Sequence, residues 1–300
     1  MKIIAIIGQS ASGKSDIAHE IAKETGAALL SMDSLAVYKN IEIASAKPNK
    51  NDREGLAYFG LDLVTPNEKF GAEDFIREFL KARDFCRENN RDLIIVGGSA
   101  FYLKCLTSGL SKLPEISEKT REIVNEKLLD LNAAFNELKS RDPIYAIKIK
   151  NSDRYRIEKA LLIMIASDIK PSEWFSQNPP EALLDELAIF LVELGREELL
   201  KRIKLRTEKM IEIGLVDEVK NLLAIADRGS QPMKAIGITE TIDFIDEKIS
   251  LKELSELITI HTAQFTKRQK TYYKGQFNNL IAADKNSLIK TAIKYLNFSR

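Results

Sequence analysis

The sequence predicts an α/β protein whose core is a doubly wound parallel sheet with a P-loop, interrupted by a helical insertion. Short apolar runs without polar alternation, typical of strands buried on both faces, occur at residues 2–7, 27–32 and 92–96. The first run leads into a glycine-rich octapeptide with P-loop spacing. Between residues 117 and 167 strand signals almost vanish and charged helical periodicity replaces them. We therefore expect a helical insertion at about 113–186, between core segments 1–112 and 187–300.

The octapeptide predicts a site for a phosphorylated ligand. It consists of Gly8, Gln9, Ser10, Ala11, Ser12, Gly13, Lys14 and Ser15. Gly8 lets the chain turn off the strand, Gly13 lets the backbone approach an oxyanion, and the N–H groups of residues 10–15 can converge on a phosphate. Lys14 adds a positive charge, and Ser15 offers a hydroxyl suited to Mg2+. The loop alone leaves open whether the ligand is a nucleotide or a diphosphate, and a turn that binds nothing is the alternative.

An acidic residue is expected close to this loop. Residues 16–25 predict a helix, and the strand predicted at 27–32 ends directly before Asp33. In an open α/β sheet the carboxyl ends of the strands line the ligand crevice, so we expect Asp33 to face the P-loop. A turn or capping role suits its position equally well.

Strands and helices alternate through the rest of the core. Helices are predicted at 73–88, 196–213 and 215–226, and strands at 92–96, 187–192 and 280–283. The strand at 92–96 leads into Gly97-Gly98-Ser99, and Asn286 is expected to cap the final helix. Ser250 and Glu253 predict a capping box at the start of another long helix, on which His261 is expected to be a hydrogen-bonded core residue.

Composition excludes several classes of protein. Cys86 and Cys105 are too few and too far apart for a disulfide framework or a zinc ribbon, and we expect both in the core. Met1 leads straight into the first strand and no apolar run approaches membrane-spanning length, so we expect neither a signal peptide nor a membrane span, and a cytoplasmic location.

Basic residues gather in two segments although the net charge is only +1. One segment lies at 148–159. The other holds Lys267, Arg268, Lys270 and Lys274, interleaved with Tyr272, Tyr273 and Phe277. Solvated helix faces are the simpler interpretation, but the interleaved aromatic residues favour nucleic acid.

Taken together, these motifs resemble those of the tRNA dimethylallyltransferases, and the resemblance runs nearly end to end. The matching motifs are the P-loop, Asp33-Ser34-Leu35-Ala36-Val37-Tyr38, Ile43-Ala44-Ser45-Ala46-Lys47-Pro48, Gly97-Gly98-Ser99-Ala100-Phe101-Tyr102, Asp142-Pro143, Asp153 with Arg156 and Lys159-Ala160-Leu161, Arg206 with Met210 and Gly214-Leu215, Glu218-Val219, Ile236-Gly237 with Glu240, and Lys267-Arg268-Gln269-x-Thr271. The chain departs from the family pattern at Ala36, Tyr58-Phe59, Lys159, Ala263 and Tyr272, where Gln, two His, Arg, Arg and Trp are usual.

The resemblance implies transfer of a dimethylallyl group from dimethylallyl diphosphate to N6 of the adenosine 3′ of the anticodon of tRNA. It implies a general base at Asp33, diphosphate stabilisation by Lys14, Arg206 and Mg2+ held partly by Ser15, and contacts of the insertion with tRNA. The residues expected at the tRNA, here the anticodon stem-loop, are Asp33, Ser34, Leu35, Ala36, Ser99, Arg156, Lys159, Lys267 and Arg268. No membrane and no obligate protein partner is inferred.

Two other functions fit parts of the pattern. Small-molecule kinases of the nucleotide or shikimate type share a P-loop and an acidic residue after the second strand, but the strand at 92–96 ends without an obvious Walker-B Asp. A non-catalytic, nucleotide-gated RNA-binding module is the other alternative. Tight ATP binding favours either of these, whereas binding of pyrophosphate or dimethylallyl diphosphate without an effect of ATP favours the transferase.

Overall fold

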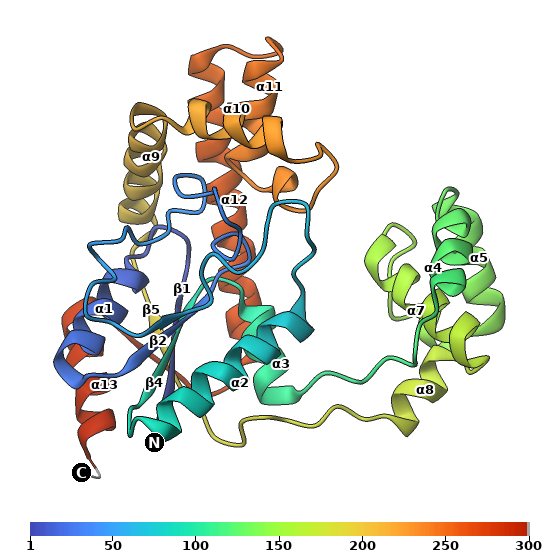
Figure 1. The fold of residues 1–300 in the computed structure, drawn as a ribbon, viewed down its shortest axis with the longest axis horizontal. Coiled ribbons are helices and arrows are strands. Elements are labelled where there is room, and N and C mark those ends of the chain that lie inside the picture. Colours follow the sequence, from blue (N-terminus) through green and yellow to red (C-terminus); the bar gives the residue numbers. More distant parts are fainter. Residues whose placement is uncertain (299–300) are drawn as a thin grey trace. The chain divides into compact units, whose positions relative to one another are not determined.

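The computed structural model describes residues 1–298 and contains one six-stranded parallel sheet in the order β3-β2-β4-β1-β5-β6 (Figure 1). The strands are β1 (Ile3–Gly8), β2 (Ala28–Met32), β3 (Tyr58–Phe59), β4 (Leu93–Gly97), β5 (Ala188–Val192) and β6 (Leu280–Ala283). Every neighbouring pair is parallel. The predicted fold class is therefore confirmed, including the short last strand.

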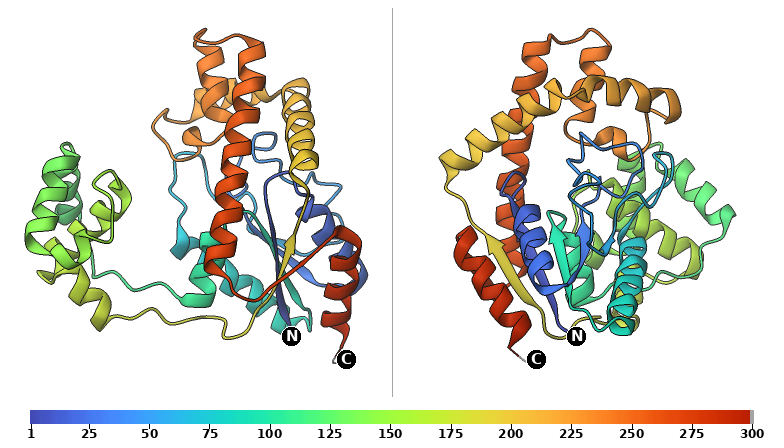
Figure 2. Two further views of the ribbon diagram at one scale, coloured as in Figure 1. Left: turned by 180° about the vertical axis from the view of Figure 1, so that it is seen from behind. Right: turned by 60° about the vertical axis from the view of Figure 1, so that its left-hand side comes forward.

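Helices cover both faces of the sheet, because successive strand residues point to opposite sides. Ile4 and Ile6 of β1 pack with α1 (Lys14–Thr25) and α13 (Lys285–Asn297) on one face. Ala5 and Ile7 point to the other face, where α2 (Ala72–Glu88) and α3 (Ala100–Ser108) pack (Figure 2). These strands lack polar alternation because neither face meets water.

The carboxyl ends of the strands are covered by a group of helices late in the chain. They are α9 (Arg196–Glu212), α10 (Leu215–Ile225), the 3-10 turn η1 (Pro232–Lys234), α11 (Ile238–Ile245) and α12 (Leu251–Gln276). Helix α12 packs along α9 and begins with the predicted capping box, since Ser250 and Glu253 bond reciprocally. It extends from this group down to the loops that follow β1 and β4 (Figures 1 and 2).

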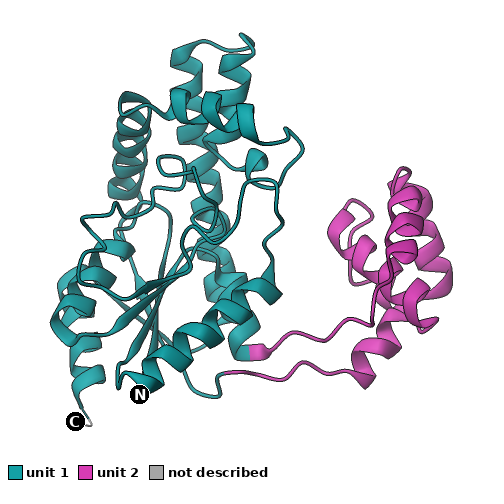
Figure 3. Cartoon of the chain, viewed as in Figure 1, with its two compact units in different colours: residues 1–107, 184–300 teal, residues 108–183 magenta. Residues whose placement is uncertain are grey.

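The chain divides into two compact units, residues 1–107 with 184–300 and residues 108–183 (Figure 3). The second unit contains only helices among its regular elements: α4 (Glu118–Lys127), α5 (Leu131–Arg141), α6 (Pro143–Ala146), α7 (Arg154–Ser167) and α8 (Pro171–Gln177). It has its own apolar core, in which Leu138 and Leu161 are fully buried. In the first unit, the backbone N–H of Leu184 donates to the carbonyl of Leu106 at 3.1 Å, so the chain leaves and re-enters this unit at one place.

Two local expectations are wrong. Asp284, not Asn286, caps α13, because its Oδ1 accepts from the N–H groups of residues 286 and 287. His261 is hydrogen-bonded to Glu240 at 2.5 Å, but 42% of its side chain is exposed, so it is not a core residue. Both cysteines are buried and unpaired, as expected. No helix within residues 1–298 is long and apolar enough to cross a lipid bilayer.

Two of the three aromatic residues of the basic segment on α12 are too deeply buried to stack on a base. Tyr273 and Phe277 are 1% and 7% exposed and belong to the core. Residues four apart lie on the same side of a helix, and here that side faces inward. Lys267, Arg268, Lys270 and Lys274 remain exposed and Tyr272 is half-buried, so this segment offers a partner mainly its charges.

Candidate active site

The P-loop connects the end of β1 to the start of α1. Gly13 has a φ of 83°, in the left-handed region that glycine adopts without strain, and Ala11 has a φ of 65°. Two of the loop's amides already have partners: Ser12 N–H donates to the Gln9 carbonyl at 3.1 Å, and Ser10 N–H donates to Gln269 Oε1 at 2.9 Å. The first N–H groups of α1 have no carbonyl partner within the helix and can serve an anion.

Lys14 places a partly buried ammonium group at the end of this loop. Its Nζ donates to the carbonyl of Gln9 at 3.4 Å. Desolvation lowers the pKa of Lys14 to about 8, the negative charge of Asp33 opposes this shift, and the positive charge of Arg206 adds to it. Burial also lowers the pKa of the Arg206 guanidinium, again against the attraction of Asp33. Two cations and one carboxylate therefore share one poorly hydrated region, which leaves a net positive charge for an anion.

Asp33 and Arg206 line a cavity of about 380 Å3 at the carboxyl edge of the sheet, and the P-loop contributes Ser10 to its lining. Its polar lining comes from the segments that follow β1, β2 and β4, from η1 and from α9 and α12. It consists of Ser10, Asp33, Ser34, Ser45, Ser99, Arg206, Thr207, Lys234, Thr262, Arg268 and Gln269. An apolar set from α9, α12 and the turn after η1 faces it, including Ile203, Met210, Ile236 and Ile258. The cavity thus joins an anion site to a region suited to a small hydrocarbon group.

Asp33 serves as a turn cap and also faces the cavity. Its Oδ1 accepts from the backbone N–H of Leu35 at 2.8 Å and of Ala36 at 3.2 Å. Ser34 N–H donates to Ser99 Oγ at 3.2 Å, which ties the segment after β2 to the segment after β4. Among residues 1–298 Oδ2 makes no such bond, so it is the oxygen left for a ligand.

Two glycines allow these strand-end segments to approach one another. A Cβ on Gly97 would lie 2.0 Å from the Met32 carbonyl oxygen, and one on Gly98 would lie 2.6 Å from Gln269 Nε2. Neither position can carry a side chain without moving its neighbours. The Gly97-Gly98 pair therefore fixes how close the end of β2 and helix α12 can lie to β4.

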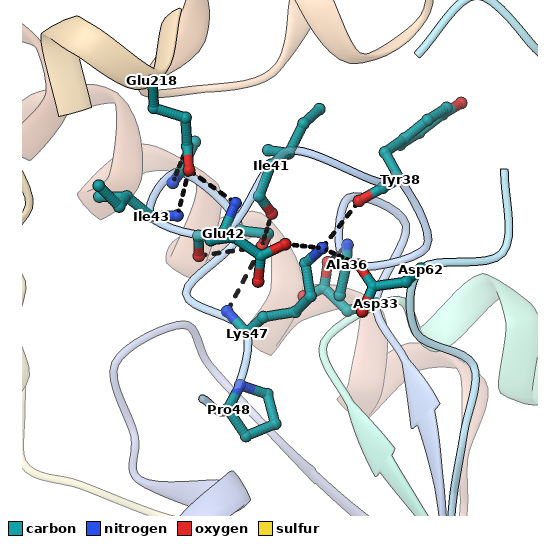
Figure 4. A network of polar contacts seen from close by, with 12 residues as sticks. Asp33, Ala36, Tyr38, Ile41, Glu42, Ile43, Lys47, Pro48, Asp62 and Glu218 are labelled. Atoms are coloured by element: carbon teal, nitrogen blue, oxygen red, sulfur yellow. Dashed lines mark hydrogen bonds and ion pairs between the residues drawn. The ribbon is translucent and has the colours of Figure 1, made fainter. Parts of the chain in front are cut away.

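A second carboxylate holds the loop that forms one wall of the cavity. Glu218 on α10 accepts from the N–H groups of Glu42 and Ile43 at 2.7 Å each and of Ala44 at 2.9 Å (Figure 4). Three charge-assisted bonds to one side chain fix the orientation of this turn, and Ala44 and Ser45 line the cavity.

A fully buried ammonium group fixes the other side of the same loop. Lys47 Nζ donates to the Tyr38 carbonyl at 2.8 Å, to Glu42 Oε1 at 3.0 Å and to Asp62 Oδ1 at 2.5 Å (Figure 4). Arg53 completes the pairing of Asp62 at 3.0 Å. The ammonium uses all three of its donors, so its burial is compensated.

The structure brings together only some of the site residues expected from sequence. Ser10, Asp33, Ser34, Leu35, Ser99, Arg206 and Arg268 line the cavity, with the rest of the P-loop adjoining it. Ala36 is buried at 3% exposure and is not part of the lining. Lys267 is exposed on α12. Arg156, paired with Asp153 at 3.4 Å, and Lys159, over the Tyr155 ring, lie on α7 in the other unit.

Sequence analysis missed the structural roles of Glu218 and Gln269. Both residues were matched as parts of motifs, but nothing in their spacing shows which backbone groups they bind. The sequence offers one signal for Gln269. This uncharged residue interrupts a run of basic residues, and it lies three residues after Thr266 and four before Tyr273, on the same side of the helix.

The fold and the site together define a P-loop protein of the α/β class whose anion-binding loop opens on a cavity with one carboxylate and an apolar wall. Comparison with known proteins narrows this class. The family model described as IPP transferase matches residues 36–276, most of the chain. The chain therefore belongs to the IPP transferase family.

Individual relatives agree with this assignment. A tRNA dimethylallyltransferase from Sulfurimonas denitrificans is 44% identical over 283 residues, which cover 94% of this chain and 95% of the relative. A full-length tRNA isopentenylpyrophosphate transferase from Bacillus halodurans has a similar structure, with a TM-score of 0.71 and 25% identity over 98% of this chain and 95% of that one. A eukaryotic dimethylallyltransferase acting on tRNA shares the fold, with a TM-score of 0.81 and 24% identity over 97% of this chain and 76% of that one.

Replacing Glu218 tests its hold on the 42–44 turn. For Glu218→Ala we expect the three amides of the turn to lose hydrogen-exchange protection and the free energy of unfolding to fall by about 2 kcal/mol, because each N–H loses a charged acceptor. Asp217→Ala, an exposed acidic neighbour on the same helix, is the matched control. Unchanged protection at residues 42–44 in Glu218→Ala contradicts the assignment.

Replacing Lys14 tests its desolvation. Because its pKa is lowered in the folded state, the unfolded chain binds more protons between about pH 8 and 10.5, and the cost of burying the charge is fully present below pH 8. We expect Lys14→Met to raise the free energy of unfolding at pH 7 by on the order of 2 kcal/mol, a gain that shrinks as the pH rises towards 10. Lys23→Met, at an exposed position of α1, is the control. A less stable Lys14→Met protein at pH 7 shows that the ammonium stabilises the fold instead.

Proposed function

We propose that this protein transfers a dimethylallyl group from dimethylallyl diphosphate to N6 of the adenosine 3′ of the tRNA anticodon and releases diphosphate. The observation that carries the proposal is the carboxylate of Asp33 in one cavity with Ser10 of the P-loop and Arg206, facing an apolar wall. Membership of the IPP transferase family supports it, as do relatives named tRNA dimethylallyltransferases. Action on tRNA implies a cytoplasmic location.

The P-loop end of the cavity suits the leaving group. As the bond between the allylic carbon and the diphosphate oxygen breaks, its electron pair goes to the diphosphate and negative charge builds up there. The first amides of α1, Lys14 and Arg206 are groups that stabilise such charge, and they act strongly where water is scarce.

Ser15 is the residue that would hold Mg2+. Its hydroxyl oxygen, in the first turn of α1, is a hard donor of the kind this ion prefers. In proteins this ion usually binds through one or two side chains together with substrate phosphates and water, which fits a site beside the diphosphate. When bound, Mg2+ would neutralise part of the charge of the leaving group.

Asp33 is suited to act as the general base. The exocyclic amine of adenine is a weak nucleophile, and its nitrogen loses a proton as it forms the new bond to the allylic carbon. Oδ1 of Asp33 is held by two backbone amides, which leaves Oδ2 to accept that proton. The turn at Leu35 and Ala36 fixes the direction in which the carboxylate points.

Basic side chains outside the cavity suit the RNA. An adenosine stacked in the anticodon loop has to be extruded to reach Asp33, and Ser34, Leu35, Ser99 and Arg268 line the cavity that would receive it. Exposed Lys267 on α12, together with Arg156 and Lys159 on α7 of the insertion, can hold phosphates. Ala36 is buried and has no polar side chain, so it cannot make the contacts that the Gln usual at this position could make with RNA.

The two alternatives are less well supported. Neither a small-molecule kinase nor a nucleotide-gated RNA-binding module accounts for a family match over residues 36–276. Incubation with Mg2+, dimethylallyl diphosphate and bulk tRNA, followed by nucleoside mass spectrometry, tests the proposal directly. Dimethylallylated adenosine is expected, and its absence together with tight ATP binding contradicts the proposal.

The role of Asp33 can be separated from its turn cap. Asp33→Asn retains an oxygen for the N–H groups of residues 35 and 36 but cannot take a proton at neutral pH. We expect its single-turnover rate to fall at least about a hundredfold, with binding of both substrates largely kept. Asp33→Ala is expected to lose at least as much. A near-normal rate for Asp33→Asn excludes Asp33 as the base.

The basic face of α12 is tested by charge reversal. Because Arg268 lines the cavity, Lys267→Glu is the cleaner variant, and we expect it to raise the Michaelis constant for tRNA about tenfold while that for dimethylallyl diphosphate stays within about twofold. Lys252→Glu makes the same charge change about 22 Å away on the same helix. Equal effects of Lys267→Glu on both substrates, or equal effects of the two variants on tRNA, refute the assignment.

A further inference from the structure

The C-terminal half of α12 packs on the P-loop through buried polar side chains. Thr266, Gln269 and Tyr273 lie three and four residues apart, so they share one side of the helix, and they are 3%, 6% and 1% exposed. In the N-terminal half, the corresponding side of the helix carries apolar residues, Leu254 and Ile258. Burying a polar group raises the free energy of the folded state unless the group is hydrogen-bonded, so each of these side chains needs a partner.

Each of the first three residues of the P-loop is bonded to this side of α12. The hydroxyl of Tyr273 lies 3.0 Å from the Gly8 carbonyl oxygen, and Gln9 Nε2 donates to the Thr266 carbonyl at 3.0 Å. Ser10 N–H donates to Gln269 Oε1 at 2.9 Å.

Two of these side chains lie between the same two strand ends. The hydroxyl of Tyr273 is also 3.1 Å from the Gly98 carbonyl oxygen, but a single O–H cannot donate fully to both carbonyls, whereas Gln269 bonds the two segments through separate atoms. Its Oε1 accepts from Ser10 after β1, and its Nε2 donates to the Gly98 carbonyl after β4 at 3.1 Å. The reversed amide would place NH2 against N–H and oxygen against oxygen, so the two partners define its orientation. The missing side chain at Gly98 provides the space, since a Cβ there would lie 2.6 Å from Nε2.

The strand ends that Gln269 joins carry the two halves of the chemistry. Ser10 belongs to the loop that ends in Lys14, and Ser99, the residue after Gly98, accepts from Ser34 N–H beside Asp33. A displacement of about 1 Å between the leaving-group site and the base is enough to slow a reaction about a hundredfold.

We propose that Gln269 is a positioning residue that sets the spacing between the diphosphate site and the turn of Asp33 by bonding Ser10 and Gly98 at once. The inference rests on the proposed function, since it concerns the same site. Gln269 need not touch the reacting atoms, and its effect passes through the two backbone groups that it holds.

The test uses Gln269→Met, which keeps the length of the side chain and removes both bonds. We expect calorimetric binding of inorganic pyrophosphate with Mg2+ to weaken about tenfold, because Ser10 in the loop that binds it loses the contact with Gln269. The single-turnover rate at saturating substrates is expected to fall at least tenfold, while tRNA binding stays within about twofold. Gln264→Met, the same change at an exposed position of α12, is expected to match the wild type in all three measurements.

Gly98→Ala provides an independent route to the same contact. The nearest atom to the added Cβ is Gln269 Nε2, and the next ones lie 3.8 Å away or more, so the substitution acts first on this amide. We expect Gly98→Ala to reproduce the defect, and the double variant with Gln269→Met to be no worse than the worse single variant. Should Gln269→Met fail to fold, Gly98→Ala decides alone.

Failure of the proposed function and failure of the role proposed for Gln269 give different results. Wild-type protein that binds no pyrophosphate and transfers no dimethylallyl group overturns the proposed function, and the inference with it. Wild-type protein that does both, with a folded Gln269→Met or Gly98→Ala protein that retains wild-type pyrophosphate affinity and rate, overturns the inference alone. Additive losses in the double variant also overturn it, since they show that the two positions act separately.

Discussion

Burial of the Lys14 ammonium beside the P-loop is the constraint on which the site depends. An unpaired buried cation is unfavourable, and the protein tolerates this one because Asp33 lies near and because the cavity is shaped for an anion. The same requirement explains why an acidic residue follows the second strand, whereas Arg206, from a helix far along the chain, adds positive charge that an anion in the cavity offsets. An arrangement that is costly without ligand becomes favourable when a negatively charged group arrives.

The parts of the fold that rest on local chemistry could be predicted from sequence. Strands β1, β2, β4 and β5 are apolar runs because both faces of the sheet are covered, and the P-loop needs fixed residues at fixed spacing. The capping box at Ser250 is another local pattern that the structure confirms. The prediction that Asn286 caps the last helix is wrong because Asp284, two residues earlier, is an equally good capping residue and accepts from the first amides of the helix.

Contacts between distant segments could not be predicted in this way. The charges around Gln269 and Tyr273 suggest a solvent-facing helix, yet both side chains are buried against loops more than 170 residues earlier in the chain. In the sequence, Glu218 is one of several acidic residues on an amphipathic helix, and nothing there shows that it accepts from the backbone amides of the turn at 42–44. The contacts at Tyr58-Phe59 also join distant segments, because Tyr58 meets the His19 ring edge-on and Phe59 packs on Phe85.

The hydrogen bond between Leu184 and Leu106 has a consequence for how the chain could have been assembled. The first unit leaves off and resumes at a single point, so its sheet order and its helix cover do not depend on what lies between. A segment inserted at such a point can lengthen, shorten or change its surface while the register of the core stays the same. Residues 108–183 can therefore change in length or surface with little effect on the residues that line the cavity in the first unit.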